Sequence, residues 1–462
     1  MHSSCDVLII GAGMSGLAAG IRLAHFGRRV AILEQHTLVG GLNSYYNRHG
    51  REFEVGLHAV TNYADPSDRR APLNRLLRQL RIARDALQLC PQGQSAIQFP
   101  DTTLHFNNDF AEFEAEVDRL FPDEVDRFRM FVRRVLEEDC YALDASPQPA
   151  RPILEQFLRD PLLREMLLTP IMFYGNAMEN DMDFTQFCLL FRSIFLEGLW
   201  RPDGGIRRLV DLLVDRYREA GGELHLGVAV ERLEVENNRV ARAVCADGTV
   251  LEAAAVLSTA GALETLRLCD PEPPEASQWP PGMLSFVETV LIVDQPTAQL
   301  GIPATIRFDN QSNQLRFARA TQAVDYESRV LCMPDNFQHP AESAIDPAIR
   351  VTRLANYEDW FRMDPQAYQD AKDELLEHEL AVLEQEIPSI RHHLVCTDMF
   401  TPRTVNRFTG HLHGAVYGSP RKQRDGKTPL DNLFIAGTDQ GFLGVIGALM
   451  SGVSITNARL LA

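Results

Sequence analysis

The sequence predicts an α/β fold: a Rossmann-type nucleotide domain, built from a parallel sheet and a β-meander, with a second part of α+β character. Three observations carry this prediction. They are a glycine turn between strand-like runs within residues 6–34, a strand-rich stretch at 224–260, and a strand, a turn and a helix start at 432–449. The chain has 462 residues, enough for two or three domains with cores of their own.

Residues 6–34 have the pattern of a complete βαβ unit, with an apolar strand, a Gly-x-Gly-x-x-Gly turn, a helix and a second strand that ends in an acid. The first glycine permits the tight turn, the second lets a pyrophosphate approach the backbone, and the third allows close packing of helix on strand. The N-terminus of the helix favours an anion, and the terminal acid suits ribose hydroxyls. From this unit we expect these cofactor contacts: Gly11, Gly13, Met14, Ser15, Gly16 and Glu34.

The residues after Glu34 indicate which dinucleotide is bound. A second glycine pair follows six residues later, and the run Phe-Glu-Val-Gly-Leu-His occupies residues 53–58. This pattern resembles the FAD family that includes amine oxidases and phytoene desaturases, with Glu54 where that family usually has Asp. In that family the glycine pair lines the pyrophosphate and the later strand runs beside the isoalloxazine. The resemblance implies FAD, contacted by Gly40, Gly41, Leu42, Gly56, Leu57 and His58. We expect the FAD to be non-covalent, since the sequence has no obvious attachment motif.

Two later segments return the chain to the same domain. An amphipathic helix at 206–220 leads into strands that predict a β-meander from residue 224 to residue 260, for which a plain structural hairpin is the alternative. In the resembling family the residue that matches Val230 contacts adenine through its backbone. The strand at 432–439 ends in an acid that can accept hydrogen bonds from ribityl hydroxyls, and the helix after it can stabilise reduced flavin. The expected contacts are Val230, Ala260, Gly437, Asp439, Gly444, Val445 and Ile446.

The three nucleotide segments predict a discontinuous FAD-binding domain, separated by two insertions that form a substrate or cap domain. The FAD-binding domain comprises residues 1–64, 201–275 and 398–462, and the cap comprises 65–200 and 276–397. We expect the first cap segment to be mostly helical, at 110–138, 153–168 and 184–199, and the second to contain strands such as 284–293. Apolar residues at 167–173 and 187–200 fit a tunnel for an apolar chain, a surface that dips into a membrane, or the core of a helical cap.

Beyond the cofactor motifs, most of the chain resembles phytoene desaturases, carotenoid isomerases and retinol saturases. The resemblance rests on FEVGLHA at 53–59, the Phe-Pro break at 121–122, TPRT at 401–404, RFTG at 407–410, GAVYG at 414–418 and the run at 437–452. Leu443-Gly444 stands where bacterial phytoene desaturases tend to have Pro-Gly, and the last run is closer to saturases. The resemblance implies an FAD-dependent oxidoreductase that acts on C=C bonds of an apolar polyene or isoprenoid. Desaturation, saturation and flavin-mediated cis-trans isomerisation all stay open.

C=C chemistry at a flavin needs hydride transfer and at most one proton donor or acceptor, so a mostly apolar site is sufficient. His58 is the first candidate for the proton role, because the resembling strand passes the isoalloxazine; a structural histidine is the alternative. Tyr417 and Arg403 are further catalytic candidates. No metal site is expected, since the eight cysteines have no CxxC pair and no zinc-like Cys/His spacing, and they are interpreted as free buried thiols.

The main rival is an amine or amino-acid oxidase of the same superfamily, many of which place a lysine near the flavin. The three lysines are Lys372, in a helix predicted at 368–385, and Lys422 and Lys427, in a loop, so we expect none in that role. A second rival is a flavin-bound escort that positions a lipid without turnover.

The net charge of −18 argues against a nucleic-acid partner, because phosphate contacts need clustered Lys and Arg. No signal segment and no run of about 18 apolar residues is present, so we expect a cytoplasmic protein with at most peripheral membrane contact. No second Gly-x-Gly-x-x-Gly motif exists for a nicotinamide cofactor. Electrons are therefore expected to pass to or from quinone, oxygen or a partner protein.

Overall fold

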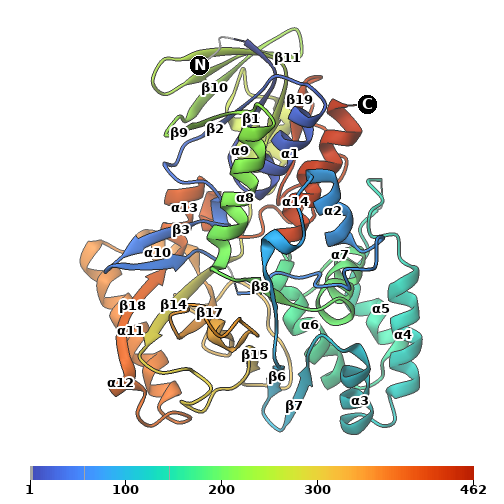
Figure 1. Ribbon diagram of the computed structural model, residues 1–462, viewed down its shortest axis with the longest axis vertical. Coiled ribbons are helices and arrows are strands. Elements are labelled where there is room, and N and C mark those ends of the chain that lie inside the picture. The colour runs from blue at the N-terminus through green and yellow to red at the C-terminus, as the bar shows by residue number, and fades with distance from the viewer. Residues whose placement is uncertain (1–3, 57, 145, 462) are drawn as a thin grey trace.

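The computed structural model describes residues 4–56, 58–144 and 146–461. Figure 1 shows an upper part that contains both ends of the chain, and a lower part with a group of helices on one side and a sheet with its own helices on the other. Leu57, one of the expected cofactor contacts, lies outside the described residues.

An eight-stranded sheet, here called the upper sheet, forms the centre of the upper part. Its order is β13-β10-β11-β12-β1-β2-β9, with β19 paired to β12. β1 runs parallel to β2 and β12, while β10, β11 and β12 form the antiparallel meander. The predicted architecture is confirmed, except that β9, expected in the meander, pairs parallel with β2 instead. The strands are β1 (Ser4–Ile10), β2 (Val30–Glu34), β9 (Glu223–Leu226), β10 (Val230–Glu236), β11 (Arg239–Cys245), β12 (Val250–Ser258), β13 (Cys269–Asp270) and β19 (Leu433–Ile435).

Helix α1 (Met14–His25) packs against this sheet through glycines. A Cβ atom at Gly16 would lie 2.0 Å from the carbonyl oxygen of Gly11, so only glycine lets the helix start so close to the turn. A Cβ atom at Gly452 would lie 2.1 Å from the carbonyl oxygen of Ser15, which brings α14 equally close to α1. The other helices of the upper part are α2 (Pro72–Leu80), α8 (Gly205–Glu219), α9 (Ala262–Arg267) and α14 (Gly444–Ile455).

A seven-stranded sheet, here called the lower sheet, has the order β18-β14-β17-β16-β15-β6-β7. Its pairs are antiparallel except for β15 with β6, and all nine residues of β14 are buried. β18 extends past residue 397, where the sequence placed a domain boundary, and pairs with β14 along its length. The strands are β6 (Ser95–Phe99), β7 (Thr102–Phe106), β14 (Ser285–Val293), β15 (Ile306–Asn310), β16 (Ser328–Cys332), β17 (Ala348–Ala355) and β18 (Leu394–Phe400).

The helices of the lower part are shorter than expected. The predicted helix at 110–138 breaks at the Phe121-Pro122 pair, and that at 153–168 ends at Phe157. A new helix starts at Pro161, because the Asp160 side chain accepts the NH groups of the first turn and proline suits the first helical position. The elements are α3 (Phe110–Leu120), α4 (Val125–Glu137), α5 (Ala150–Phe157), α6 (Pro161–Gly175), α7 (Phe184–Phe191) and a π-helical turn at Arg192–Leu196.

Smaller elements join the two parts. They are the hairpin β3 (Tyr45–Arg48) and β4 (Arg51–Glu54), the ribbon β5 (Leu89–Pro91) and β8 (Trp200–Pro202), and the helices α10 (Tyr357–Arg362) and α13 (Pro402–Thr409). The helices α11 (Pro365–Leu383) and α12 (Ile390–His393) pack against the lower sheet. The run at 53–58, expected as a strand, is a strand only to Glu54. Gly56 then takes a positive φ of 63°, where a Cβ atom would lie 2.6 Å from the carbonyl oxygen of Leu42.

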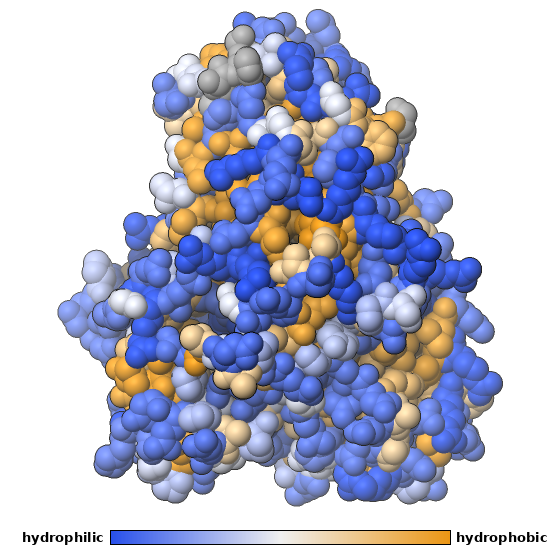
Figure 2. Space-filling view, viewed as in Figure 1, coloured by the Kyte–Doolittle hydropathy of each residue, from blue (hydrophilic) through white to orange (hydrophobic). Residues whose placement is uncertain are grey.

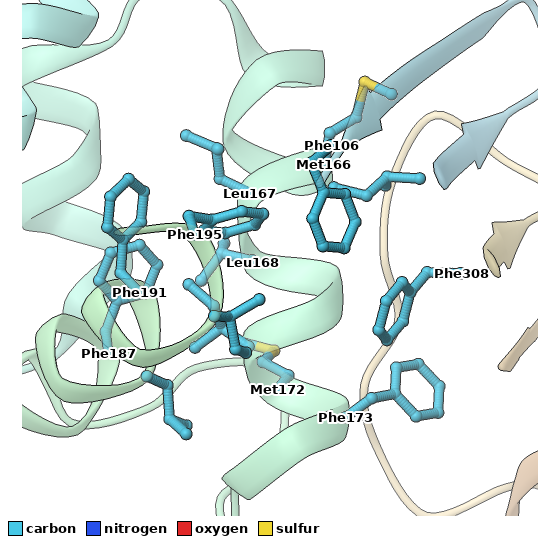
Figure 3. Close-up of a cluster of buried hydrophobic side chains, with 14 of the residues drawn as sticks. Phe106, Met166, Leu167, Leu168, Met172, Phe173, Phe187, Phe191, Phe195 and Phe308 are labelled. Atoms are coloured by element: carbon cyan, nitrogen blue, oxygen red, sulfur yellow. The ribbon is translucent and has the colours of Figure 1, made fainter. Parts of the chain in front are cut away.

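The apolar segments at 167–173 and 187–200 are mainly core. Figure 3 shows Leu167, Leu168 and Met172 of α6 gathered with the phenylalanines of α7 and the π-helical turn. Phe173 points to the other side of α6, towards Phe308. Among the three interpretations of these segments, a helical core therefore describes most of their residues.

Figure 2 shows polar residues over most of one face, with apolar residues gathered near its middle. In the described ranges no helix combines the length and the apolar character needed to cross a bilayer. All eight cysteines are free thiols, and all but Cys396 are buried, as the sequence predicted.

Candidate functional site

A cavity of about 1270 Å³ lies between the upper and lower sheets. Its wall combines the β1–α1 turn, the second glycine pair, the ends of β2 and β12 and the start of α14 with side chains of the lower sheet and of α13. The wall thus has a glycine-rich end formed by the upper sheet and an apolar end formed by the lower part.

Backbone of three chain segments meets at the glycine-rich end. Gly11 has a φ of 98°, and Gly13 forms a bridge with Gly40, whose NH group donates to the carbonyl oxygen of Ala12 over 2.9 Å. A Cβ atom at Gly41 would lie 3.6 Å from the Cα atom of Gly13. Glycines in both turns therefore keep side chains out of the space beside the first turn of α1.

Two helix N-termini border this space. α1 begins after Gly13 and α14 begins after Leu443, and neither start has a side-chain cap among the described residues. The free NH groups and the helix dipoles favour a negatively charged group, so the cradle fits the pyrophosphate and the pyrimidine edge of a flavin dinucleotide.

Glu34 ends β2 on the cavity wall with 8% of its surface exposed. One carboxylate oxygen accepts the NH group of Ala12 over 2.7 Å, and the other accepts the NH group of His36 over 2.9 Å. Each oxygen keeps lone-pair capacity for a further donor. The carboxylate is therefore held in place by backbone on the cavity wall, and its expected contact with ribose hydroxyls stays a prediction.

Most of the expected cofactor contacts lie on this wall. They are Gly11, Gly13, Met14, Ser15, Glu34, Gly40, Gly41, Leu42, Gly56, His58, Val230, Ala260, Gly437, Gly444 and Val445. Gly16 lies beneath the turn, and Ile446 is buried with 1% of its surface exposed. The cofactor contacts of these residues stay predictions.

The structure does not place Asp439 on the cavity wall, contrary to its expected position. It is 2% exposed, and its two carboxylate oxygens accept the NH groups of Ala262 and Ser419, each over 2.7 Å. The acid therefore ties two buried turns together. A motif at the end of a strand could not reveal these partners, because they come from distant parts of the chain.

His58 lies on the wall at the border between the two ends of the cavity. Its Nε2 atom is 2.9 Å from the hydroxyl oxygen of Thr352 and 3.4 Å from a carboxylate oxygen of Glu288. Its backbone carbonyl oxygen accepts a hydrogen bond from Arg201 over 2.8 Å. Ring and backbone of His58 are thus both held by buried polar residues.

A row of alternating charges lies behind His58. Arg350 forms ion pairs with Glu288 and Glu54, and Glu54 also pairs with Arg201. Burial raises the pKa of Glu288, but the charges of Arg350 and His58 outweigh burial and bring the pKa down to about 2. For Glu54 burial is likewise outweighed, by Arg201 and Arg350, and its pKa falls. Both carboxylates are therefore ionised and already paired.

Sequence reasoning missed Glu288, Thr352 and Arg350. The available signal was a charged side chain within a strand that is otherwise apolar, as in Ser-Phe-Val-Glu-Thr-Val-Leu-Ile-Val of β14. Burying such a charge is costly unless a partner is present, so the pattern indicates a buried ion pair.

Tyr417 and Arg403, the other catalytic candidates, also line the cavity. The Tyr417 hydroxyl donates to the carbonyl oxygen of Phe173, and burial raises the pKa of this tyrosine. The Arg403 guanidinium lies over the ring of Tyr368, 4.9 Å from its centroid. The hydroxyl of Tyr417 is therefore occupied by a hydrogen bond to the backbone of α6. Arg403 lies in the first turn of α13.

The lysines lie where the sequence placed them, Lys372 in α11 and Lys422 and Lys427 in the loop before β19. Lys372 is part of the cavity wall, with its Nζ atom 5.8 Å from the ring centroid of Tyr368. Lys422 is buried, and its Nζ atom donates to the carbonyl oxygens of Tyr417 over 2.6 Å and Thr438 over 3.0 Å. Burial lowers the pKa of Lys422 to about 8.

The lower part contributes an apolar wall next to His58. Phe173 and Phe308 lie beside each other, as Figure 3 shows, and both border the cavity. The other apolar members of this wall are Ala59, Tyr174, Phe286, Val330 and Val416. An apolar chain fits this surface, with the imidazole of His58 as a polar group at its edge.

Comparison with known proteins agrees with this geometry. Residues 14–458 match the family model described as flavin containing amine oxidoreductase. The phytoene desaturase (lycopene-forming) of Pseudescherichia vulneris is 28% identical over 284 residues, a match that spans 56% of this chain and 56% of that protein. The chloroplastic prolycopene isomerase of Daucus carota is 22% identical over 97% of this chain and 78% of its own length. The all-trans-retinol 13,14-reductase of Danio rerio is 23% identical over 98% of this chain and 86% of its own length.

Solved structures share the fold. An oxidoreductase from Methanosarcina mazei superposes with a TM-score of 0.68 at 16% identity, covering 98% of this chain and 100% of that chain. A putrescine oxidase variant gives a TM-score of 0.63 at 17% identity, covering 99% of each chain.

Proposed function

Because the chain belongs to the family of flavin containing amine oxidoreductases and its cofactor is FAD, we propose that it acts on C=C bonds of an apolar polyene or isoprenoid. Desaturation, saturation and cis-trans isomerisation are the three forms that this chemistry can take. The relatives named as phytoene desaturase, prolycopene isomerase and retinol reductase support the substrate class. For a net redox reaction we propose quinone, oxygen or a protein as the electron partner.

The observation that carries the proposal is the apolar wall next to His58. Phe173, Phe286 and Phe308 present aromatic surface to the cavity, and such surface gains free energy by covering an apolar chain. Bound FAD supplies the two-electron chemistry. The protein must then hold the substrate, exclude water and provide one proton site.

We assign the proton role to Nδ1 of His58. A threonine hydroxyl donates only one hydrogen bond, and that of Thr352 lies 3.4 Å from the Glu288 carboxylate, to which it donates. The Thr352 oxygen therefore accepts from Nε2 of His58, which leaves Nδ1 to accept or release a proton. A carboxylate oxygen of Glu288 lies 3.4 Å from the same Nε2 atom.

The same contacts disfavour amine oxidation. A carboxylate that the protein leaves unpaired would hold an ammonium substrate by its charge. Glu288 pairs with Arg350, and Asp398, another acid on the wall, pairs with Arg48 and accepts the Tyr46 hydroxyl over 2.6 Å. Both carboxylates are therefore neutralised by the protein itself.

We further propose that the cavity opens towards a membrane surface that delivers the substrate. Phe361 and Phe408 border the cavity and are 40% and 44% exposed. The cations Lys372, Arg403 and Arg407 border it as well, on a chain with a net charge of −18. Exposed aromatic rings and cations together favour an anionic lipid surface.

In the test, FAD-loaded protein is incubated under anaerobic conditions with one of five compounds: phytoene, lycopene isomers, retinol, putrescine or cyclohexylamine. Each incubation is done once with oxidised and once with chemically reduced flavin. We expect a polyene product that has lost two hydrogens, gained two hydrogens or isomerised at constant mass, and no flavin reduction by the amines. Flavin reduction by an amine with all polyenes unchanged would make the chain an amine oxidase. Tight polyene binding without any product in either flavin state would make it a lipid escort.

A further inference from the structure

Three potential metal ligands from distant parts of the chain lie together outside the cavity. Cys90 belongs to β5, Asp203 directly follows β8, and His339 follows the turn at 334–336. One ligand atom of each lies within 4.8 Å of the other two. The three residues are absent from the described cavity wall, so the group is separate from the flavin site.

Two atoms of this group are buried without a hydrogen bond among the described residues: Nδ1 of His339 and Oδ1 of Asp203. The other ring nitrogen of His339, Nε2, lies 3.0 Å from the carbonyl oxygen of Pro334 and must donate to it. In the neutral ring Nδ1 therefore carries a lone pair, on a side chain that is only 9% exposed. Two buried lone pairs that face each other are costly unless a cation lies between them.

The distance between these atoms suits two ligands of one metal ion. Nδ1 and Oδ1 are 3.4 Å apart, longer than the N–H···O distance of about 2.9 Å that is usual for a hydrogen bond. Two zinc bonds of about 2.0 Å at the tetrahedral angle separate their ligand atoms by about 3.3 Å. We propose that Cys90 Sγ, Asp203 Oδ1 and His339 Nδ1 bind one Zn²⁺ ion.

The ligand types and charges agree with zinc. Sulfur, imidazole and carboxylate together select a borderline cation rather than Mg²⁺ or Ca²⁺, which prefer oxygen. The contact of His339 Nε2 with a backbone carbonyl is the usual outer contact of a metal-bound histidine. The Asp203 side chain is 18% exposed, which leaves a path for a water molecule as the fourth ligand.

Burial raises the pKa of the Cys90 thiol to about 11, so the sulfur is protonated in the absence of metal. Binding then replaces the S–H bond by an S–Zn bond and releases one proton to water, with no change in oxidation state. The ion would join the β5–β8 ribbon to the loop that follows residue 336. A structural clamp between this ribbon and this loop of the lower sheet is the expected role.

The test uses FAD-loaded protein, treated with chelator and then titrated with Zn²⁺ or Co²⁺ alone. We expect one metal ion per chain, a thiolate-to-cobalt charge-transfer band above the flavin background, and weaker binding at lower pH. Cys90→Ser should abolish this band, and His339→Ala should weaken binding by at least about tenfold. His105→Ala is the matched control, because His105 faces Glu116 at 3.3 Å on the surface and should leave binding unchanged.

The FAD content and the circular dichroism spectrum show whether each variant is folded. The milder Asp203→Asn variant should also bind the metal ion more weakly. The proposal is overturned if the fully FAD-loaded wild-type protein binds neither ion. It is also overturned if Cys90→Ser and His339→Ala bind both ions as the wild type does. His339 would then form an ordinary ion pair with Asp203.

Discussion

Nε2 of His58 lies 2.9 Å from the hydroxyl oxygen of Thr352, a residue 294 positions away in the sequence. Thr352 pairs with Glu288 in the register of β17 and β14, so one cross-strand pair of the lower sheet holds the imidazole. Behind that pair, Arg350 forms ion pairs with Glu288 and Glu54. We propose that the other ring nitrogen, Nδ1, transfers the proton beside the apolar wall.

Removing the imidazole should slow the reaction. For His58→Gln we expect kcat to fall by about 10²–10⁴, the usual contribution of a general acid or base, with FAD content unchanged. His105→Ala, at a 40% exposed side chain, is the control. Turnover of the polyene measured by chromatography decides the matter, and a rate within about twofold of the wild type would remove His58 from the mechanism.

Glu288→Gln should destabilise the fold, because Arg350 loses a buried partner, at a cost of about 3–5 kcal/mol. The pKa of Glu288 is about 2 in the folded protein, below the ordinary 4.5. Its contribution is therefore fully present above pH 4.5 and lost as the pH falls towards 2. Urea unfolding should show that the free energies of unfolding of Glu288→Gln and the wild type differ less at pH 3 than at pH 7. An equal difference at both values would contradict the low pKa.

Glu197 should affect the pH dependence of stability in the opposite direction to Glu288, because its pKa is raised. Burial raises its pKa from 4.5 to about 7, although the Asn62 amide donates to it over 2.8 Å. The folded protein then binds the proton more tightly than the unfolded chain, so stability falls by about 1.4 kcal/mol per pH unit between pH 4.5 and 7. Glu197→Gln should be more stable than the wild type at pH 8 and less pH-dependent. Parallel stability curves for the two proteins would refute the raised pKa.

Glu34→Gln should weaken FAD binding. The glutamine amide has one acceptor oxygen instead of two, so the backbone NH groups of Ala12 and His36 and the proposed ribose hydroxyls compete for it. Loss of one charged hydrogen bond costs about 1.5–3 kcal/mol, or roughly 10- to 150-fold in the dissociation constant. Flavin fluorescence in a titration of apoprotein measures the change. Glu231→Gln, on the exposed side of β10, should bind as the wild type does, and equal loss in both variants would argue against a specific role of Glu34.

The double variant Phe361→Ser and Phe408→Ser should bind anionic vesicles more weakly than the wild type, since both exposed rings border the cavity. Binding of the wild type should fall with added salt, because cations contribute. Phe26→Ser is the control, as this ring is 57% exposed on the upper part. Co-sedimentation that is unchanged in the double variant, or absent in the wild type, would exclude this surface as the docking site.

The nucleotide end was predictable because its signals are local. The turn from Gly11 to Gly16, the flanking strands and Glu34 lie within 30 residues, and their pattern has one physical interpretation. The partners of His58 were not, because they depend on strand register: Glu288 and Thr352 are 64 positions apart and meet only when β14 pairs with β17. Asp439 shows the same limit, since its motif indicated a ligand contact while its partners in the structure are two backbone turns and Lys422.

The most direct test of the proposed chemistry is the amount of polyene product formed by three preparations of the same protein: with oxidised FAD, with chemically reduced FAD, and without FAD. We predict a changed C=C bond pattern with at least one FAD-loaded form and none without FAD. Equal conversion by the FAD-free protein, or no conversion by either loaded form, would contradict the account.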